Sequence, residues 1–161
     1  LRQNKGGNMG KRKTDSVQRD QSKIAALGFT HAPGIISFLL PVPPSSNHIW
    51  RVGRTGVYLS PTATQWREAA NLAALDQKIT RACFRVPVFV SFELILGEGF
   101  RRGRDLNNLP KLLFDWLVSW GLIVDDDWES VPGYEFRMGP REWQCPGNPA
   151  AIAVSIYPYE N

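Results

Sequence analysis

The stretch RRGRDLNNLPKLLFDWLVSWGLIVDDDWE, residues 101–129, decides the fold of this chain. Arginines crowd its beginning, an amphipathic run occupies its middle, and carboxylates close it. Proline has no amide hydrogen and is tolerated only in the first turn of a helix, so Pro110 predicts a helix that begins at about Asn107 or Asn108. Asparagine is a good N-cap, and Gly121 is the predicted C-cap.

The predicted helix has one apolar face. Its members recur at helical spacing and are Leu109, Leu113, Trp116, Leu117 and Trp120. Lys111 and Asp115 lie off this face. The face predicts that the helix packs on a hydrophobic core, with its charged residues turned away.

Carboxylates lie beyond both ends of the helix. Asp105 and Asn107 precede it on an expected extended segment, where a period of two points both side chains the same way. Asp125, Asp126, Asp127 and Glu129 follow it, and like charges past a helix C-terminus favour a bound cation. Oxygen ligands suit Mg²⁺ or Mn²⁺ and not zinc. The alternatives are a capping role for Asp105 and a solvated acidic loop at 125–129.

The run R-D-L-N-N-L-P-K, followed by F-D-W-L, G-L-I and D-D, resembles the signature of the RusA-type Holliday junction resolvases, nucleases of bacteria and their phages. The family pattern is R-D-L-D-N, a lysine shortly after, a helix, and D-D. Carried over by position, the resemblance implies catalytic and metal-binding positions at Asp105, Asn107 and Asp126, with the family's lysine at Lys111. The family has a second Asp where this chain has Asn107, so we expect weak or absent cleavage with DNA binding retained.

A second motif lies in the N-terminal half. The run P-V-P-P-S-S-N at 41–47, followed by an aromatic residue, arginine and a serine before a helix, is also similar to the family. Residues 48–61 predict a loop or loose hairpin whose aromatics and arginines suit nucleic acid. An ordinary hairpin with one packed Trp is the alternative. The expected DNA-binding residues are Asn47, Trp50, Arg51, Arg54, Arg101, Arg102 and Arg104.

The rest of the chain predicts a small α/β (α+β) domain with the order β-α-β-α-β-β and a mixed sheet. Strands are expected at 35–40 and 88–96, and a final antiparallel pair at 134–138 and 152–156. A helix capped by Ser60 and Pro61 is expected to pack through Leu72, Leu75, Ile79 and Cys83. The family resemblance implies the same fold and a homodimer, which suits the two-fold symmetry of a four-way junction.

Charge is distributed unevenly along the chain. Residues 1–32 hold seven Lys/Arg and two Asp, or +5, so the remainder of the +4 total is −1. This polar segment predicts a flexible basic arm, and residues 33–161 the nuclease domain. The arm could add phosphate affinity, while a solubilising tail or a cloning remnant is the alternative.

Several functional classes lack their signatures. The two cysteines match no zinc spacing and indicate a reducing, cytoplasmic setting, and the histidines form no metal motif. There is no nucleotide-binding glycine motif, no secretory signal and no apolar run long enough to span a bilayer. We therefore expect neither a nucleotide cofactor nor a membrane partner, and a nucleoid-associated protein of a bacterial or phage-infected cell.

The expected function is a Mg²⁺-dependent, structure-selective DNA endonuclease of the junction-resolvase type. Asp105 and Asp126 would hold the metal, and Lys111 and Arg104 would hold the phosphate. Since the helix separates Asp105 from Asp126, the acidic loop must fold back along it or face the site across a subunit interface. The alternatives are a non-cleaving junction-binding protein, natural or engineered, and a basic-tailed module that binds nucleic acid without metal.

Overall fold

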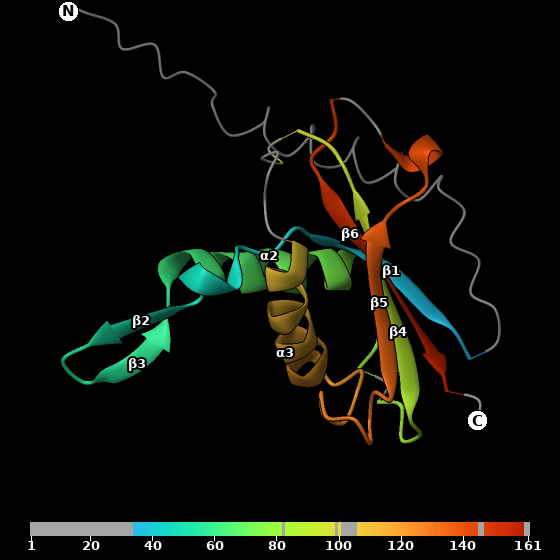
Figure 1. Ribbon diagram of the computed structural model, residues 1–161, viewed down its shortest axis with the longest axis horizontal. Helices are drawn as coiled ribbons and strands as arrows, with labels where there is room; N and C mark the ends of the chain where they lie inside the picture. The colour runs from blue at the N-terminus through green and yellow to red at the C-terminus, as the bar shows by residue number, and fades with distance from the viewer. Residues whose placement is uncertain (1–33, 82, 99, 101–105, 145–146, 160–161) are drawn as a thin grey trace, which may run out of the picture.

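The computed structural model describes residues 34–81, 83–98, 100, 106–144 and 147–159. Two helices cover one face of a four-stranded sheet, and a two-stranded hairpin projects away from this body (Figure 1). The elements are β1 (Ile36–Pro41), η1 (Ser46–His48), β2 (Trp50–Gly53), β3 (Gly56–Leu59), α2 (Pro61–Asp76), β4 (Val88–Ile95), η2 (Leu106–Asn108), α3 (Pro110–Trp120), β5 (Gly133–Met138), η3 (Arg141–Trp143) and β6 (Ala151–Pro158). The arm predicted at 1–32 lies outside the described residues.

The sheet is mixed, as predicted, with the strand order β1-β6-β4-β5. The expected antiparallel pairing of the last two strands is wrong: β5 pairs parallel with β4, and β6 pairs antiparallel with both β4 and β1. The physical reason is the connection, because helix α3 carries the chain from β4 to the start of a parallel neighbour. β6 then takes a central position, where its Ile152, Val154 and Ile156 are fully buried.

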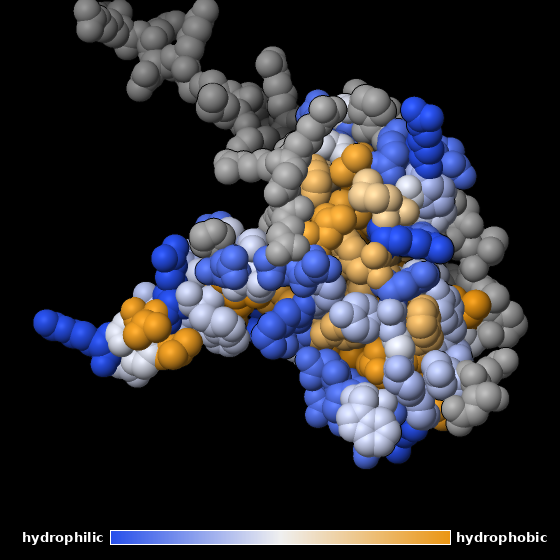
Figure 2. Space-filling model, in the orientation of Figure 1, coloured by the Kyte–Doolittle hydropathy of each residue, from blue (hydrophilic) through white to orange (hydrophobic). Residues whose placement is uncertain are grey.

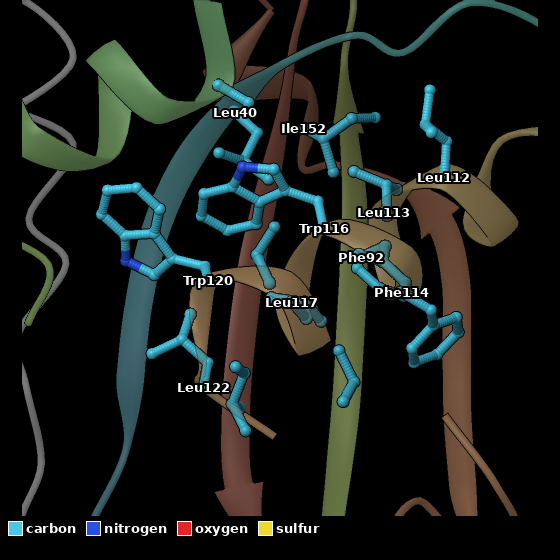
Figure 3. Close-up of a cluster of buried hydrophobic side chains, with 14 of the residues drawn as sticks. Leu40, Phe92, Leu112, Leu113, Phe114, Trp116, Leu117, Trp120, Leu122 and Ile152 are labelled. Carbon is cyan, nitrogen blue, oxygen red and sulfur yellow. The ribbon is translucent and has the colours of Figure 1, made fainter. Parts of the chain in front are cut away.

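Helix α3 supplies the largest part of the core. The predicted apolar face is confirmed, since Leu109, Leu113, Trp116, Leu117 and Trp120 are all buried. Figure 3 shows the side chains of α3 lying over Leu40, Phe92 and Ile152 of the sheet. Trp116 stacks on Trp120 with ring centroids 5.4 Å apart. Burial of this face is what holds the helix against the sheet.

The start of α3 differs from the prediction. Asn107 and Asn108 lie in the 3₁₀ turn η2, and the N-cap is Leu109, so the expected asparagine cap is wrong. The expected extended segment is likewise wrong at Asn107. Pro110 does occupy the first turn, and Gly121 closes the helix with φ 81°, both as predicted. Pro110 and the buried Leu109 thus set the helix start by packing rather than by a polar cap.

Helix α2 begins at the predicted Ser60 cap, whose hydroxyl accepts the N–H of Ala63 at 3.2 Å. Its predicted packing stripe is wrong as a helical face, because Leu72 and Leu75 are 63% and 61% exposed and the helix ends before Ile79 and Cys83. Of the four predicted residues, only Ile79 is buried in the core. The buried face is Ala63, Trp66, Ala70 and Ala74. Small residues allow close approach to β1, and two anchors set the rotation of the helix.

Those anchors are hydrogen bonds to β1. Trp66 Nε1 donates to the carbonyl of Pro41 at 2.9 Å. The Gln77 side chain accepts from the N–H of Leu39 and donates to its carbonyl, both at 2.8 Å. These three directional bonds to partly buried backbone groups set the rotation of the helix, although two leucines are exposed as a result.

The sheet face opposite the helices is partly polar. Ser91 and Glu93 are buried on it; Ser91 donates to Glu135 at 2.7 Å, and Glu93 pairs with Arg137. The Glu93 carboxylate raises the pKa of Arg137. Trp143 of η3 packs beside these groups on a small apolar cluster. No helix in the described part of the chain is long and apolar enough to cross a membrane.

Candidate functional site

A hydrogen bond joins the two separate sequence motifs. Ser46 Oγ, in the P-P-S-S-N run, donates to Asn108 Oδ1 at 2.9 Å across 62 positions of the chain. Residues Ser46 and Asn108 belong to the 3₁₀ turns η1 and η2, which directly precede the hairpin and α3. The contact places the start of the hairpin beside the N-terminus of α3.

The N-terminus of α3 is electropositive. Its N-cap, Leu109, has no side-chain oxygen, and no acidic residue lies in the first turn. Lys111 is exposed in that turn, where a cation opposes the helix dipole. Asn107 is exposed on the preceding turn. An anion such as a phosphate would complement this end of the helix, because backbone N–H groups and an ammonium are grouped there.

A hollow of about 310 Å³ runs along the outer flank of α3. It lies between the hairpin base, α2, α3 and the loop after α3, and its lining residues are Trp50, Leu59, Arg67, Leu112, Asp115, Val118, Ser119, Asp125 and Asp126. The 11 residues of α3 span about 16 Å at about 1.5 Å per residue. Asp125 and Asp126 therefore line the same hollow as Leu112, Asp115, Val118 and Ser119 of the helix.

The loop carboxylates differ in their surroundings. Asp125 accepts the N–H of Asp126 at 2.8 Å, and Asp127 accepts the N–H of Ser130 at 2.7 Å. This Ser130 bond lowers the pKa of Asp127 below its ordinary value. Asp127 therefore organises the loop. The Asp126 side chain has no hydrogen bond or ion pair among the described residues and borders the hollow.

Charges of both signs face the hollow. Arg67 of α2 lines it together with Asp115, Asp125 and Asp126, and no ion pair joins this arginine to any of the three carboxylates. Arg67 is therefore not within 4 Å of those carboxylate oxygens. The arginine and the carboxylates line one hollow without pairing, so a group bound there could contact both.

The predicted metal-binding set is only partly described. Asp105 lies outside the described residues, Asn107 is on η2, and Asp126 is in the loop beyond α3. The described ranges contain no group of three or more His, Cys, Asp or Glu side chains placed to hold a metal ion. The donors at the hollow are carboxylate and hydroxyl oxygens, a chemistry that fits Mg²⁺ or Mn²⁺.

The predicted DNA-binding residues divide into two groups. Arg101, Arg102 and Arg104 lie outside the described residues. The others are exposed along η1 and the hairpin: Asn47, Trp50, Arg51 and Arg54. The hairpin expected here is confirmed, but Trp50 is half-exposed at its base rather than packed in the core.

Sequence reasoning did not find Arg67 or Asp115 as site residues. Arg67 lies in the middle of α2, and the period of that helix was assigned to the wrong face. Asp115 was visible as a residue off the apolar face of α3. The only local sequence signal for the hollow is helical spacing, which places Leu112, Asp115 and Ser119 on one side of α3.

Comparisons with known proteins show which family this chain is similar to. Residues 41–136 match the family described as "Endodeoxyribonuclease RusA". The crossover junction endodeoxyribonuclease RusA of Escherichia coli K12 is 33% identical over 91 residues, covering 56% of this chain and 72% of that protein. The proteins of the same description from Enterobacteria phages 82 and HK97 are 33% and 31% identical over 88 and 93 residues. These two matches cover 54% and 56% of this chain and 70% and 72% of the phage proteins.

Proposed function

This chain belongs to the RusA family of endodeoxyribonucleases, and from that premise we propose that it is a structure-selective endonuclease that resolves four-way DNA junctions. The observation that carries the proposal is the family match over residues 41–136. That range includes both sequence motifs, the hairpin and the acidic loop. The hydrogen bond between Ser46 and Asn108, which unites the motifs in space, supports it.

The chain's own residues can bind and orient a phosphodiester. Lys111 and the first-turn N–H groups of α3 offer positive charge to a phosphate. Arg51 and Arg54, exposed on the hairpin, add further positive charge, and Arg101, Arg102 and Arg104 precede the second motif in the sequence. Such cationic groups fix a DNA backbone in position without reading its sequence.

We propose that Mg²⁺, or Mn²⁺, is the cofactor. Asp105, Asn107 and Asp126 would hold it, and when bound it lowers the pKa of water and stabilises charge on phosphate oxygens. Asp126 is suited to this role because its carboxylate is not used within the loop. Asp127, in contrast, is used as an acceptor for Ser130.

We propose that the active form is a homodimer in bacterial or phage-infected cells. A four-way junction has near two-fold symmetry, and two symmetric nicks need two symmetry-related sites. A two-fold dimer provides two such sites, and the same subunit contact relates them.

A second candidate function is junction binding without cleavage. Asn107 favours it, because an amide at a family carboxylate position removes one negative charge from the proposed metal site. Loss of that charge reduces repulsion toward phosphate, so DNA affinity is preserved while metal affinity falls.

The primary test compares a labelled four-way junction with a linear duplex of the same arm sequence, at matched salt. The junction should bind more tightly, with affinity falling steeply as salt rises because Lys and Arg contacts release counterions. The Arg51→Gln and Arg54→Gln variants should weaken binding, whereas Arg141→Gln, on η3 beyond the opposite sheet face, should not. Equal affinity for both DNAs would contradict structure selectivity.

The metal assignment has its own test. Asp126→Ala should weaken Mn²⁺ binding measured by calorimetry, with junction binding kept or improved. Glu129→Ala is the matched control, since Glu129 is an exposed loop carboxylate that does not line the hollow. Equal Mn²⁺ affinity in the two variants would contradict a metal-binding role for Asp126 and support the alternative, a solvated acidic loop.

A further inference from the structure

The hairpin β2–β3 has two chemically different faces. Directly paired residues of antiparallel strands share a face, and Trp50 pairs with Leu59 and Val52 with Val57. These four make one wholly apolar face. Arg51 and Tyr58 pair on the other face, where the Tyr58 ring covers Gly53 so closely that a Cβ there would lie 2.9 Å from the ring. The ribbon is therefore amphipathic.

The apolar face has no cover near its tip. Val52 is 85% exposed and Val57 65% exposed. Figure 2 shows apolar surface on the projecting hairpin, apart from the body, with hydrophilic surface at the tip. Neither strand pairs with the four-stranded sheet in the described part of the chain. An isolated two-stranded ribbon is marginally stable in water, so an apolar face of this kind is suited to a partner.

We propose that the apolar face of the hairpin binds the α3–β5 loop, residues 121–132, of a second copy of this chain. The inference rests on the proposed homodimer and names the surface that forms it, but it does not depend on nuclease chemistry. The contact is made twice in a two-fold dimer, with each copy giving its hairpin and receiving its partner's.

The hairpin and the loop are complementary in polarity and charge. The loop exposes two large apolar side chains, Trp128 at 78% and Val124 at 61%. These match the exposed valines of the hairpin. The exposed charge at the turn of the hairpin, beside its apolar face, is the cation Arg54, whereas the exposed charges of the loop are all anionic, Asp125, Asp126, Asp127 and Glu129. Two such surfaces attract between copies and disfavour hairpin–hairpin or loop–loop contact.

The apolar face fits protein better than DNA. It presents no cationic group and, apart from the Trp50 indole, no hydrogen-bond donor in its side chains, whereas a DNA surface is lined with anionic phosphates. Arg51 on the opposite face stays available for phosphate. One face can thus bind a partner subunit while the other faces DNA.

The first test measures mass by sedimentation. The 18.1 kDa chain should form a dimer, and Val52→Asp with Val57→Asp should raise its dissociation constant at least about 10-fold, as for central interface residues. Leu72→Asp with Leu75→Asp is the matched control, because both leucines are exposed on α2 away from the hairpin. It should leave the dimer unchanged.

Two outcomes overturn the inference and are distinguishable. A wild-type chain that remains monomeric would remove the proposed homodimer as well. A dimer that survives both aspartates, while junction affinity is lost, would identify the valines as a DNA wedge instead. Nicking of the junction is measured separately, and its result changes neither of these two conclusions about the dimer.

A cross-linking test addresses the loop as the occupant. In a Cys83→Ser, Cys145→Ser background, Val52→Cys chains are mixed with longer-tagged Trp128→Cys chains and oxidised. The mixed-length disulfide should dominate over either same-length product. Leu72→Cys replaces Val52→Cys as the control. If Trp128→Cys chains cross-link to Val52→Cys and to Leu72→Cys chains at equal yield, the loop is not the segment that the hairpin binds.

Discussion

The two ends of helix α3 differ in how their backbone groups are satisfied and in the charge that they carry. At the C-terminus, Gly121 adopts the left-handed conformation, and its N–H and that of Leu122 bond to carbonyls of the last turn at 3.0 Å. At the N-terminus, the cap is a leucine, and Lys111 occupies a turn where the helix dipole disfavours a cation. One end is closed by local hydrogen bonds, and the other is left electropositive.

The difference separates stability from function on one element. A satisfied C-terminus stabilises the helix whatever else is bound. An electropositive N-terminus costs stability in the free protein and recovers it when an anion binds. Substitutions at the closed end should therefore change the free energy of unfolding, whereas substitutions at the open end should change DNA binding and cleavage.

The largest expected effect is at the open end. Asn107→Asp restores a family carboxylate and should raise Mg²⁺-dependent junction cleavage by about 10²-fold or more, at similar junction affinity, as when one electrostatic group is restored to an active site. Single-turnover nicking measures it. Asn108→Asp is the matched control, one residue away and bonded to Ser46. Robust nicking by the unmodified chain, with no gain from Asn107→Asp, would contradict the role given to Asn107.

At the closed end, Gly121→Ala should lower the free energy of unfolding by about 1–2 kcal/mol, the cost of placing an L side chain in the left-handed region. A Cβ at Gly121 would meet no atom within 4 Å, so the cost is conformational and not steric. Gly121→Asn should cost less, because asparagine tolerates this conformation. Urea unfolding measures both, and equal costs for the two variants would point to packing instead.

Lys111→Glu should separate the two properties with opposite signs. It replaces a cation by an anion at a helix N-terminus and should raise the free energy of unfolding by about 0.3–1 kcal/mol at low salt. Junction affinity should fall, since a carboxylate repels phosphate. Lys111→Gln should give intermediate values for both. A loss of stability in Lys111→Glu would show that the first turn is already neutralised in the free protein.

The smallest expected effect concerns the loop beyond the closed end. Hydrogen bonding from Ser130 lowers the pKa of Asp127 from its ordinary value of 3.8, so the folded state favours the charged form. Its stabilising contribution is therefore present above about pH 3.8 and lost as pH falls through the lowered pKa. Asp127→Ala should flatten the acid limb of the free energy of unfolding plotted against pH. Parallel acid limbs for Asp127→Ala and the wild type would contradict this.

The same contrast explains which predictions failed. The α3 face and Gly121 were correct because periodicity and helix closure are properties of neighbouring residues. The packing stripe of α2 was wrong because apolar spacing favoured Leu72 and Leu75. The rotation of that helix instead follows the bonds of Trp66 and Gln77 to β1, which lies far away in sequence.

The candidate site divides in the same way. The motif residues Asn107, Lys111 and Asp126 could be named from the sequence because their spacing resembles a family pattern. Their roles stay predictions. Arg67 and Asp115 could not be named, since they join the hollow only after α2 and α3 pack together.

By itself, the sequence determined the existence and polarity of most elements: an amphipathic α3 with a glycine end, a serine-capped α2, alternating strands and a hairpin rich in arginine and aromatics. These depend on interactions within a few residues. Only the tertiary structure decided that β6 lies between β1 and β4, that Ser46 reaches Asn108, and that Asp126 lines one hollow with Arg67 and Asp115. Such contacts join residues distant in the chain, and their free energy depends on how the whole core packs, which no local pattern records.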